Sequence, residues 1–403
     1  ITQTLSGSLG RIYVQSDDLL TVGAGGIVQN NGNPGAEMGL LAASGIAIDG
    51  RVLDGAYAVG LKTTNGDITL GSGGYLQAGA LSVSAPNGSV ALISSSDAIG
   101  VVAGKSSGDF AVNDNVGTMV VGTVTLANNG FIGQQSGIAS TSGDVALQNT
   151  GSIYLANALS ISTVSGNVGV NSTGGYIHQA GSGTVSATGM SAYAFGDVAL
   201  MANNSVGTIA GQAGGGNFDF NDTGTLTVGS VASVGGLVAS QNGIKTFNYR
   251  VGLTAAQDIT VAAVIDSGTQ TTTLTSNSGS ISEAGAGAIQ AGTLSGSSNG
   301  STSLNGANTI GTLGSFSSAG FSLNDSVAIA LGNPFTLNFP SAPTTGQTYT
   351  LVTAPSVSGT LTPTTVTGLS AGQSANFSYP PGQVILTISG PATPVRLQDF
   401  GVQ

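Results

Sequence analysis

Apolar and polar residues alternate in short runs along most of the chain. The stretch 66–85, "GDITLGSGGYLQAGALSVSA", shows the pattern, with glycine and serine between the runs. Such alternation between turn formers is typical of β-strands, whose successive side chains point to opposite faces. The chain has 66 glycines in 403 residues, and each interior glycine costs a helix about 1 kcal/mol. We therefore predict an all-β protein made of many short strands.

A short repeat underlies these strands. The pattern Gly-Asp/Ser/Asn-Val/Ile-x-Leu/Val occupies residues 66–70, 88–92, 143–147, 166–170 and 196–200. The copies at 66 and 88 start 22 residues apart, and those at 143 and 166 start 23 residues apart. A unit of roughly 20–23 residues with small-residue turns fits one rung of a parallel β-helix, in which stacked rungs bury a continuous core. This predicts a parallel β-helix (β-solenoid) with about sixteen rungs before residue 330, a rod of roughly 75 Å.

A long repeat of about five rungs, or some 105 residues, is superimposed on the short one. Residues 91–114, 199–222 and 303–325 align, and their closing aspartates lie 108 and 103 residues apart. Five rungs would separate these aspartates by roughly 24 Å, too far to share a proton or a metal ion. We therefore predict structural turns whose side chains bond the local backbone. The turn residues are Asn113, Asp114, Asn221, Asp222, Asn324 and Asp325.

The composition changes near residue 331. Nine of the eleven prolines fall between 334 and 394, and five short strand-like segments separated by Pro and Gly turns replace the rung pattern. We predict a solenoid over 1–330, a small antiparallel β cap over 331–390 that shields the last rung from edge-to-edge association, and a tail or linker over 391–403.

Charge and cysteine content exclude several classes of function. The net charge is −11, there are seven Lys and Arg residues and no cysteine. Nucleic-acid binding relies on clustered Lys and Arg, so we predict no nucleic-acid partner. Disulfides and thiolate metal sites are impossible without cysteine. No apolar run approaches the roughly 18 residues of a membrane helix, so we predict no membrane insertion.

Candidate chemistry is sparse. His178 is the single histidine, its counterpart in the repeat is Ser282, and a solvent-facing rung position explains it better than catalysis. We predict no catalytic, cofactor-binding or metal-binding residue, and no cofactor. Tyr75 and Tyr176 share a "GGY" word. Such rings can cover the core at a rung corner, the interpretation we favour, or stack against sugar rings.

The repeated sequence patterns resemble those of the filamentous haemagglutinin class of large, cysteine-free repeat proteins. The resemblance rests on "GTLTVGSV" (224–231), on residues 287–325 and on the Gly-Asp-Val-x-Leu rungs, while "GQTYTLVTA" (346–354) is similar to the end of autotransporter passenger solenoids. It covers nearly the whole chain. It implies export across a bacterial outer membrane and a role as a surface adhesin or extracellular fibre.

These observations lead to one main functional hypothesis and a set of alternatives. We expect a non-enzymatic, extracellular or cell-surface structural protein of a biofilm matrix or adhesin, whose rods stack head-to-tail into homopolymeric filaments. The alternative is a carbohydrate-active β-helix. It would be either a module that binds host or biofilm glycans, or a paired-carboxylate glycoside hydrolase with acids from Asp17-Asp18 or from Asp219 and Asp222.

Overall fold

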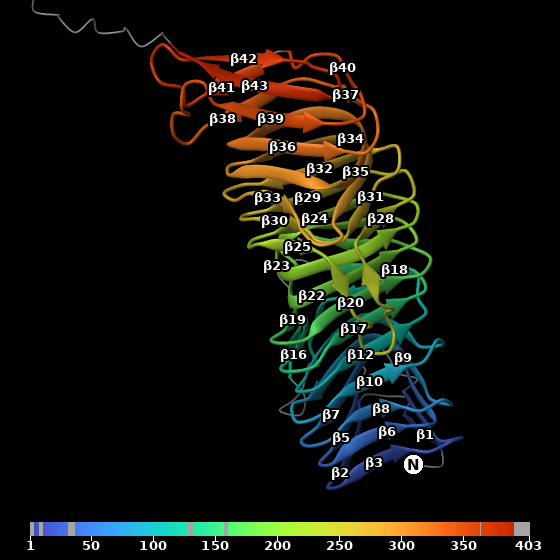
Figure 1. The fold of residues 1–403 in the computed structure, drawn as a ribbon. Coiled ribbons are helices and arrows are strands. Elements are labelled where there is room, and N and C mark those ends of the chain that lie inside the picture. The colour runs from blue at the N-terminus through green and yellow to red at the C-terminus, as the bar shows by residue number, and fades with distance from the viewer. Residues whose placement is uncertain are drawn as a thin grey trace, which may run out of the picture.

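The chain winds into a parallel β-solenoid of about 14 turns (Figure 1). The computed structural model describes residues 4–7, 11–30, 37–126, 133–156, 160–362 and 364–390. Strands make up 64% of the residues, helices none of those described. One sheet holds 39 of the strands, and two further pairs form short antiparallel hairpins. The predicted all-β fold and parallel solenoid are confirmed.

The strands up to the first hairpin are β1 (Thr4–Gly7), β2 (Arg11–Ser16), β3 (Leu19–Val22), β4 (Ile27–Asn30), β5 (Glu37–Ala42), β6 (Gly45–Ile48), β7 (Arg51–Thr63), β8 (Ile68–Leu70), β9 (Tyr75–Ala85), β10 (Val90–Ile93), β11 (Ala98–Ser106), β12 (Phe110–Asp114), β13 (Thr118–Val121), β14 (Thr123–Val124) and β15 (Gln135–Ser136). The strands from there to the second hairpin are β16 (Ile138–Ser140), β17 (Val145–Asn149), β18 (Ser152–Leu155), β19 (Ser160–Thr163), β20 (Asn167–Ser172), β21 (Ile177–Gln179), β22 (Thr184–Ala194), β23 (Val198–Ala213), β24 (Phe218–Asp222), β25 (Leu226–Val228), β26 (Ser230–Val231) and β27 (Gln241–Asn242). The remaining strands are β28 (Ile244–Thr246), β29 (Val251–Ala255), β30 (Ile259–Val261), β31 (Val264–Asp266), β32 (Thr271–Ser276), β33 (Ile281–Glu283), β34 (Ala288–Ser298), β35 (Ser301–Ser318), β36 (Gly320–Asp325), β37 (Ile329–Leu331), β38 (Phe335–Asn338), β39 (Thr348–Thr353), β40 (Val357–Ser358), β41 (Thr364–Thr367), β42 (Ser374–Ser378) and β43 (Gln383–Ser389).

Inward-facing apolar residues stack directly on one another from rung to rung. Ile68, Val90, Phe110 and Val145 are successive partners in one parallel ladder, and all four are fully buried. Their neighbours on each strand point outward because side chains alternate along a strand. One apolar cluster therefore runs from Leu20 near the first rung to Ile388 in the last strand.

Three stacks of five strands form broad sides of the solenoid and follow one another along the chain. Stack I contains β2, β5, β7, β9 and β11. Stack II contains β12, β17, β20, β22 and β23. Stack III contains β24, β29, β32, β34 and β35. Each stack begins on the side that follows the last strand of the stack before it, so one long repeat does not contain a whole number of turns.

The strand that would extend each stack is split in two. β13 and β16 pair with the two halves of the last strand of stack I, and β25 and β28 do the same above stack II. β37 and β38 repeat the arrangement above stack III. A hairpin fills the split above stacks I and II, whereas a short link at Gly332 fills it above stack III.

The expectation of about sixteen rungs before residue 330 was wrong. The hairpins lengthen their rungs, so that Gly104 pairs with Ile138 and Gly211 with Ile244. With about 14 turns, the rod is roughly 67 Å long at 4.8 Å per rung.

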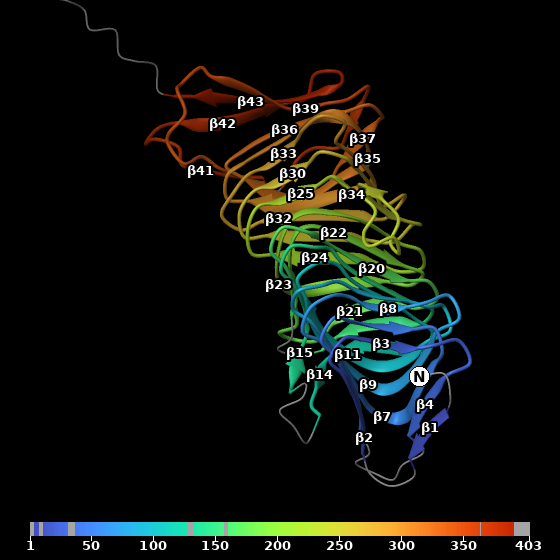
Figure 2. The ribbon, with the colours of Figure 1, turned by 90° about the horizontal axis from the view of Figure 1, so that it is seen from below.

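Antiparallel strands occur at the C-terminal end, as predicted. β39 pairs with β43 and β43 with β42 in antiparallel register (Figure 2). Within 331–390, however, β38, β40 and β41 still stack in parallel on earlier strands. The predicted tail, 391–403, lies outside the described residues.

Candidate functional site: an uncovered groove on stack III

The hairpin above stack II folds back over the outer side of that stack (Figure 1). The outward residues of the five strands are all small and buried: Ala111, Ala146, Gly169, Ser191 and Ala210. Val231, Val234 and Val238 of residues 230–242 pack on the alanines as a second apolar cluster, separate from the core. Small outward side chains thus form a trough that the hairpin fills.

Stack I has the same kind of outward ladder. Gly39, Gly60, Ser82 and Ala103 are successive partners. β14 and β15 project next to it (Figure 2), and Val124 at the start of this hairpin is buried.

Sequence reasoning missed both hairpins although a signal was present. "GTMVVGTV" (117–124) matches "GTLTVGSV" (224–231), and "QSGI" (135–138) matches "QNGI" (241–244).

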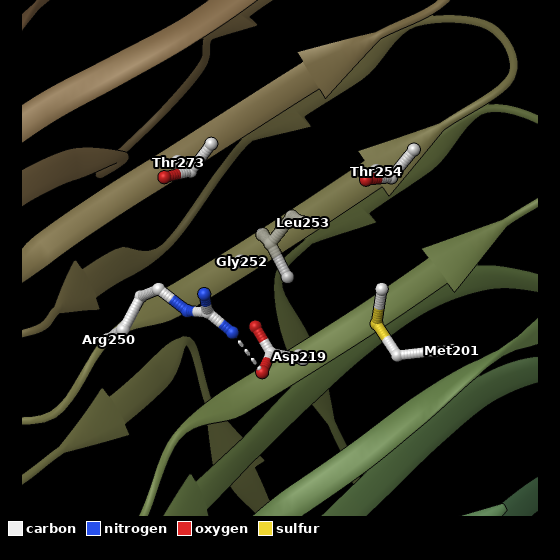
Figure 3. A pocket seen from close by; sticks show the side chains of 7 residues that line it. All are labelled: Met201, Asp219, Arg250, Gly252, Leu253, Thr254 and Thr273. Atoms are coloured by element: carbon white, nitrogen blue, oxygen red, sulfur yellow. Dashed lines mark hydrogen bonds and ion pairs between the residues drawn. The ribbon is translucent and has the colours of Figure 1, made fainter.

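Stack III has no hairpin, and its outward ladder forms a shallow groove (Figure 3). The ladder consists of Asp219, Gly252, Thr273 and Ser295, which are half-buried rather than buried. Asp219 aligns with Ala111 in the long repeat, so a carboxylate stands where stack II carries a methyl group.

An ion pair spans the floor of the groove. The Arg250 guanidinium donates from Nη2 to Asp219 Oδ2 at 2.7 Å, and 15% of the Asp219 side chain is exposed. Gly252 makes room for this carboxylate, because a Cβ there would lie 2.4 Å from Asp219 Oδ1. The remaining lining residues are Met201, Leu253, Thr254 and Thr273 (Figure 3).

Asp219 and Asp222 point to opposite faces of β24. The burial of this strand alternates, with Asp219 on the outer side and Asp222 nearly buried. Asp222 accepts hydrogen bonds from the backbone N–H groups of Val206 and Gly224, both at 2.7 Å. A pair of carboxylates that acts on one glycosidic bond must face a common space, and these two do not. Asp17 and Asp18 are both exposed on the first turn after β2.

The three Asn-Asp turns link neighbouring rungs. Asp114, Asp222 and Asp325 each accept a hydrogen bond from a backbone N–H of the preceding rung, donated by Ile99, Val206 and Ile310 respectively. Each also accepts one from a residue one or two positions ahead. The expected local bonds are present, and the bonds between rungs are additional. Asn221 and Asn324 donate to carbonyl groups of the preceding rung, while Asn113 is buried.

A second buried polar position accompanies each of these aspartates. Asn204 is the ladder partner of Asp222, and Asn308 that of Asp325. Beside Asp114 the corresponding residue is an aspartate, Asp97, instead of an asparagine. Asp97 accepts a hydrogen bond from the N–H of Leu76, as Asn204 does from Val185 and Asn308 from Ile289. One polar cap therefore recurs three times at the same kind of corner.

Burial changes the titration of these acids. It raises the pKa of Asp97 to about 7, with a further rise from the neighbouring Asp114 carboxylate, and raises the pKa of Asp114 to about 6. Burial also raises the pKa of Asp54 to about 7, helped by the Glu37 carboxylate, and neither Asp54 side-chain oxygen has a hydrogen-bond partner among the described residues. Asp222 and Asp325 have raised pKa values for the same reason, burial.

The two candidate tyrosines lie in different surroundings. Tyr75 is half-buried beneath Arg51, whose guanidinium carbon lies 5.4 Å from the ring centre. Tyr176 is 41% exposed and stacks on His178 with ring centres 4.2 Å apart. His178 Nε2 is 2.7 Å from Asp197 Oδ2. The half-exposed His178 thus has two side-chain partners that its repeat counterpart Ser282 did not suggest.

Two searches over the described parts of the chain were negative. They contain no group of three or more His, Cys, Asp or Glu residues that could hold a metal ion. They also contain no helix long and apolar enough to cross a membrane. Comparisons of the chain with protein-family models, with curated proteins and with solved structures found no match.

Proposed function

We propose that the chain is a non-enzymatic, extracellular structural protein, a bacterial surface adhesin or matrix fibre whose solenoid acts as a stiff rod. The observation that carries the proposal is the single sheet of 39 strands around one apolar core. Bending such a rod requires ladder hydrogen bonds to stretch on one side and core side chains to separate. A solenoid of this kind transmits force along its axis and presents a long lateral surface.

The surface supports an extracellular role. Only 6% of the residues are charged, and Ser, Thr and Asn side chains bond across neighbouring rungs, as between Asn171 and Gln148. Most turns between the described strands are short, and several are fixed by such bonds. Segments of this kind offer a protease few exposed, mobile cleavage sites.

The first rung supports head-to-tail association. Among the described residues, β1, β2 and β3 each pair with one strand, on the side of the next rung. Strands at the end of a sheet are templates for strand pairing with another molecule. Leu19 on β3 is 54% exposed at this end.

Sedimentation velocity over a range of micromolar concentrations tests this association. We expect oligomers that grow with concentration, and we expect Leu19→Lys to reduce them, because an edge lysine disfavours strand pairing. Val164→Lys is the matched control, since Val164 is 80% exposed in a lateral turn between β19 and β20. A monomer at every concentration would refute head-to-tail assembly, and an equal effect of both variants would refute the role of the first rung.

A glycan-binding module is the second candidate. It is favoured by the exposed Tyr176 ring on His178, an arrangement that offers an aromatic face beside polar groups. Binding of glycans to the native chain, and its loss in Tyr176→Ala, would support this candidate. Unchanged binding in that variant would oppose it.

A further inference from the structure

We propose that the groove on stack III binds an uncharged oligosaccharide chain that lies along the rod axis. This inference goes beyond the structural rod and adds a separate site to the second candidate function. It rests on the comparison of three equivalent stacks and on the side chains that replace the apolar trough of stack II.

The groove is the uncovered counterpart of a surface that the chain covers elsewhere. On stack II, Val234 and Val238 fill the trough above Gly169. On stack III, Thr273 occupies the position of Gly169 and no hairpin follows β37. The outward ladder of stack III is therefore open to a ligand along its length.

The polar groups of the groove match hydroxyl groups rather than a charged ligand. Arg250 and Asp219 neutralise each other at 2.7 Å, so the site has no net charge to attract an ion. Their outer edges still offer guanidinium donors and carboxylate lone pairs side by side. Adjacent sugar hydroxyls can accept a hydrogen bond from the guanidinium and donate one to the carboxylate. Thr254 and Thr273 add two further hydroxyl groups.

The groove disfavours a peptide strand. Peptides that add to a sheet need a free edge with unpaired backbone groups. Here Asp219, Gly252 and Thr273 lie in the middle of continuous parallel ladders, so the backbone groups are already paired. A ligand must be recognised through side chains alone.

The same outward ladder continues toward the aromatic site. His178 pairs with Ala199, Ala199 with Asp219, and Asp219 with Gly252. From His178 to Thr273 this path covers four rung steps, or about 19 Å. Met201 beside it is 54% exposed, and offers apolar surface to the C–H face of a sugar. One ligand of several sugar units can thus contact the Tyr176–His178 pair and the ion pair together.

Isothermal titration calorimetry with three uncharged hexasaccharides, cellohexaose, maltohexaose and hexa-N-acetylchitohexaose, tests the proposal. We expect at least one to bind, and expect the double variant Asp219→Ala, Arg250→Ala to weaken it about tenfold or more, because charged groups make the stronger hydrogen bonds. Alanine is accommodated at this position in stack II, as Ala111. The control is Lys245→Ala, Asp266→Ala, which removes another surface ion pair, with a 3.6 Å separation.

A second variant keeps the test decisive if the double variant misfolds. Thr273→Val retains the shape of the side chain and removes the hydroxyl, and we expect weaker binding with an unchanged circular dichroism spectrum. Failure of all three hexasaccharides to bind would overturn the proposal. So would binding that is lost in Tyr176→Ala but retained in both groove variants, since that result places the glycan at the aromatic pair alone. Electron microscopy of the same variants tests the rod independently.

Discussion

Val234 lies directly above Gly169: a Cβ on Gly169 would come within 2.7 Å of the Val234 Cβ. The two residues are far apart in sequence, and their contact holds a hairpin against the outside of a solenoid that already has a complete core. The rung that follows stack II is thereby tied to rungs below it by side chains as well as by ladder hydrogen bonds.

Gly169→Val should release the hairpin. The added side chain would also meet Val238, whose Cβ and Cγ2 lie 2.9 Å from the Cβ position. We expect faster hydrogen exchange at Val234 and Val238, and a loss of about 1–3 kcal/mol in the free energy of unfolding.

Thr273→Val is the control for this variant. It places valine at the equivalent position of stack III, where no hairpin follows, and should leave stability nearly unchanged. Equal protection of the hairpin in native and Gly169→Val proteins would contradict the packing described above.

Removal of the hairpin should leave a folded solenoid with an exposed apolar surface on one side. The link above stack III, residues 332–334, is Gly-Asn-Pro. We expect that replacing residues 230–242 with Asn-Pro, which gives the link after Gly229 the same sequence, keeps the β-sheet circular dichroism spectrum. Ala111, Ala146 and Ala210 would then be exposed as an apolar strip, and such patches bind hydrophobic dyes and promote association. Dye fluorescence and light scattering should both rise. A variant that loses its β-sheet spectrum would show instead that the hairpin is needed for folding.

Stability should decrease as the pH rises from about 4 to about 7. An unfolded aspartate releases its proton near pH 4, whereas folded Asp97 and Asp54 keep theirs until about pH 7. Over this interval the folded state binds more protons than the unfolded state, so raising the pH favours unfolding. We expect a thermal midpoint that is higher at pH 5 than at pH 8 and nearly constant above pH 8. A midpoint that rises over this range would contradict the raised pKa values.

Asp97→Asn should remove part of this dependence. Asparagine occupies the equivalent corner in the other two copies, where Asn204 donates to the carbonyl of Asn221 and Asn308 to that of Asn324. An ionised Asp97 carboxylate, by contrast, has no donor for such a hydrogen bond. We expect a thermal midpoint at pH 8 that is a few degrees higher than in the native chain, and little change at pH 4. Asp17→Asn, at an exposed position, is the control and should have no comparable effect.

The rung architecture could be predicted from the sequence because each rung is marked by a short local sequence pattern. Each Gly-Asp-Val-x-Leu word starts a strand after a corner, and its apolar positions are ladder partners, as Val90 and Ile68 are. The opposite orientations of the Asp219 and Asp222 side chains could also have been predicted from the sequence. Residues three apart on a strand face opposite sides, and the alternation of Phe218 and Phe220 identifies the inward side.

The groove and the buried acids could not be predicted in the same way. Both depend on which residues stack across rungs, and the inserted hairpins change that register. Gly252 and Asp219 become neighbours because the rung between them contains the 230–242 hairpin. The hydrogen bond from the Leu76 N–H to Asp97 likewise follows from the geometry of the corner and not from any local sequence pattern.

Negative-stain electron microscopy of the purified chain at micromolar concentration tests the central claim most directly. The structural proposal predicts rods about 67 Å long, joined end to end into filaments whose axial repeat is near one rod length. Filaments should become rare in Leu19→Lys and persist in Val164→Lys. Compact particles, or rods that remain single at every concentration while a glycan binds tightly, would contradict a self-assembling fibre.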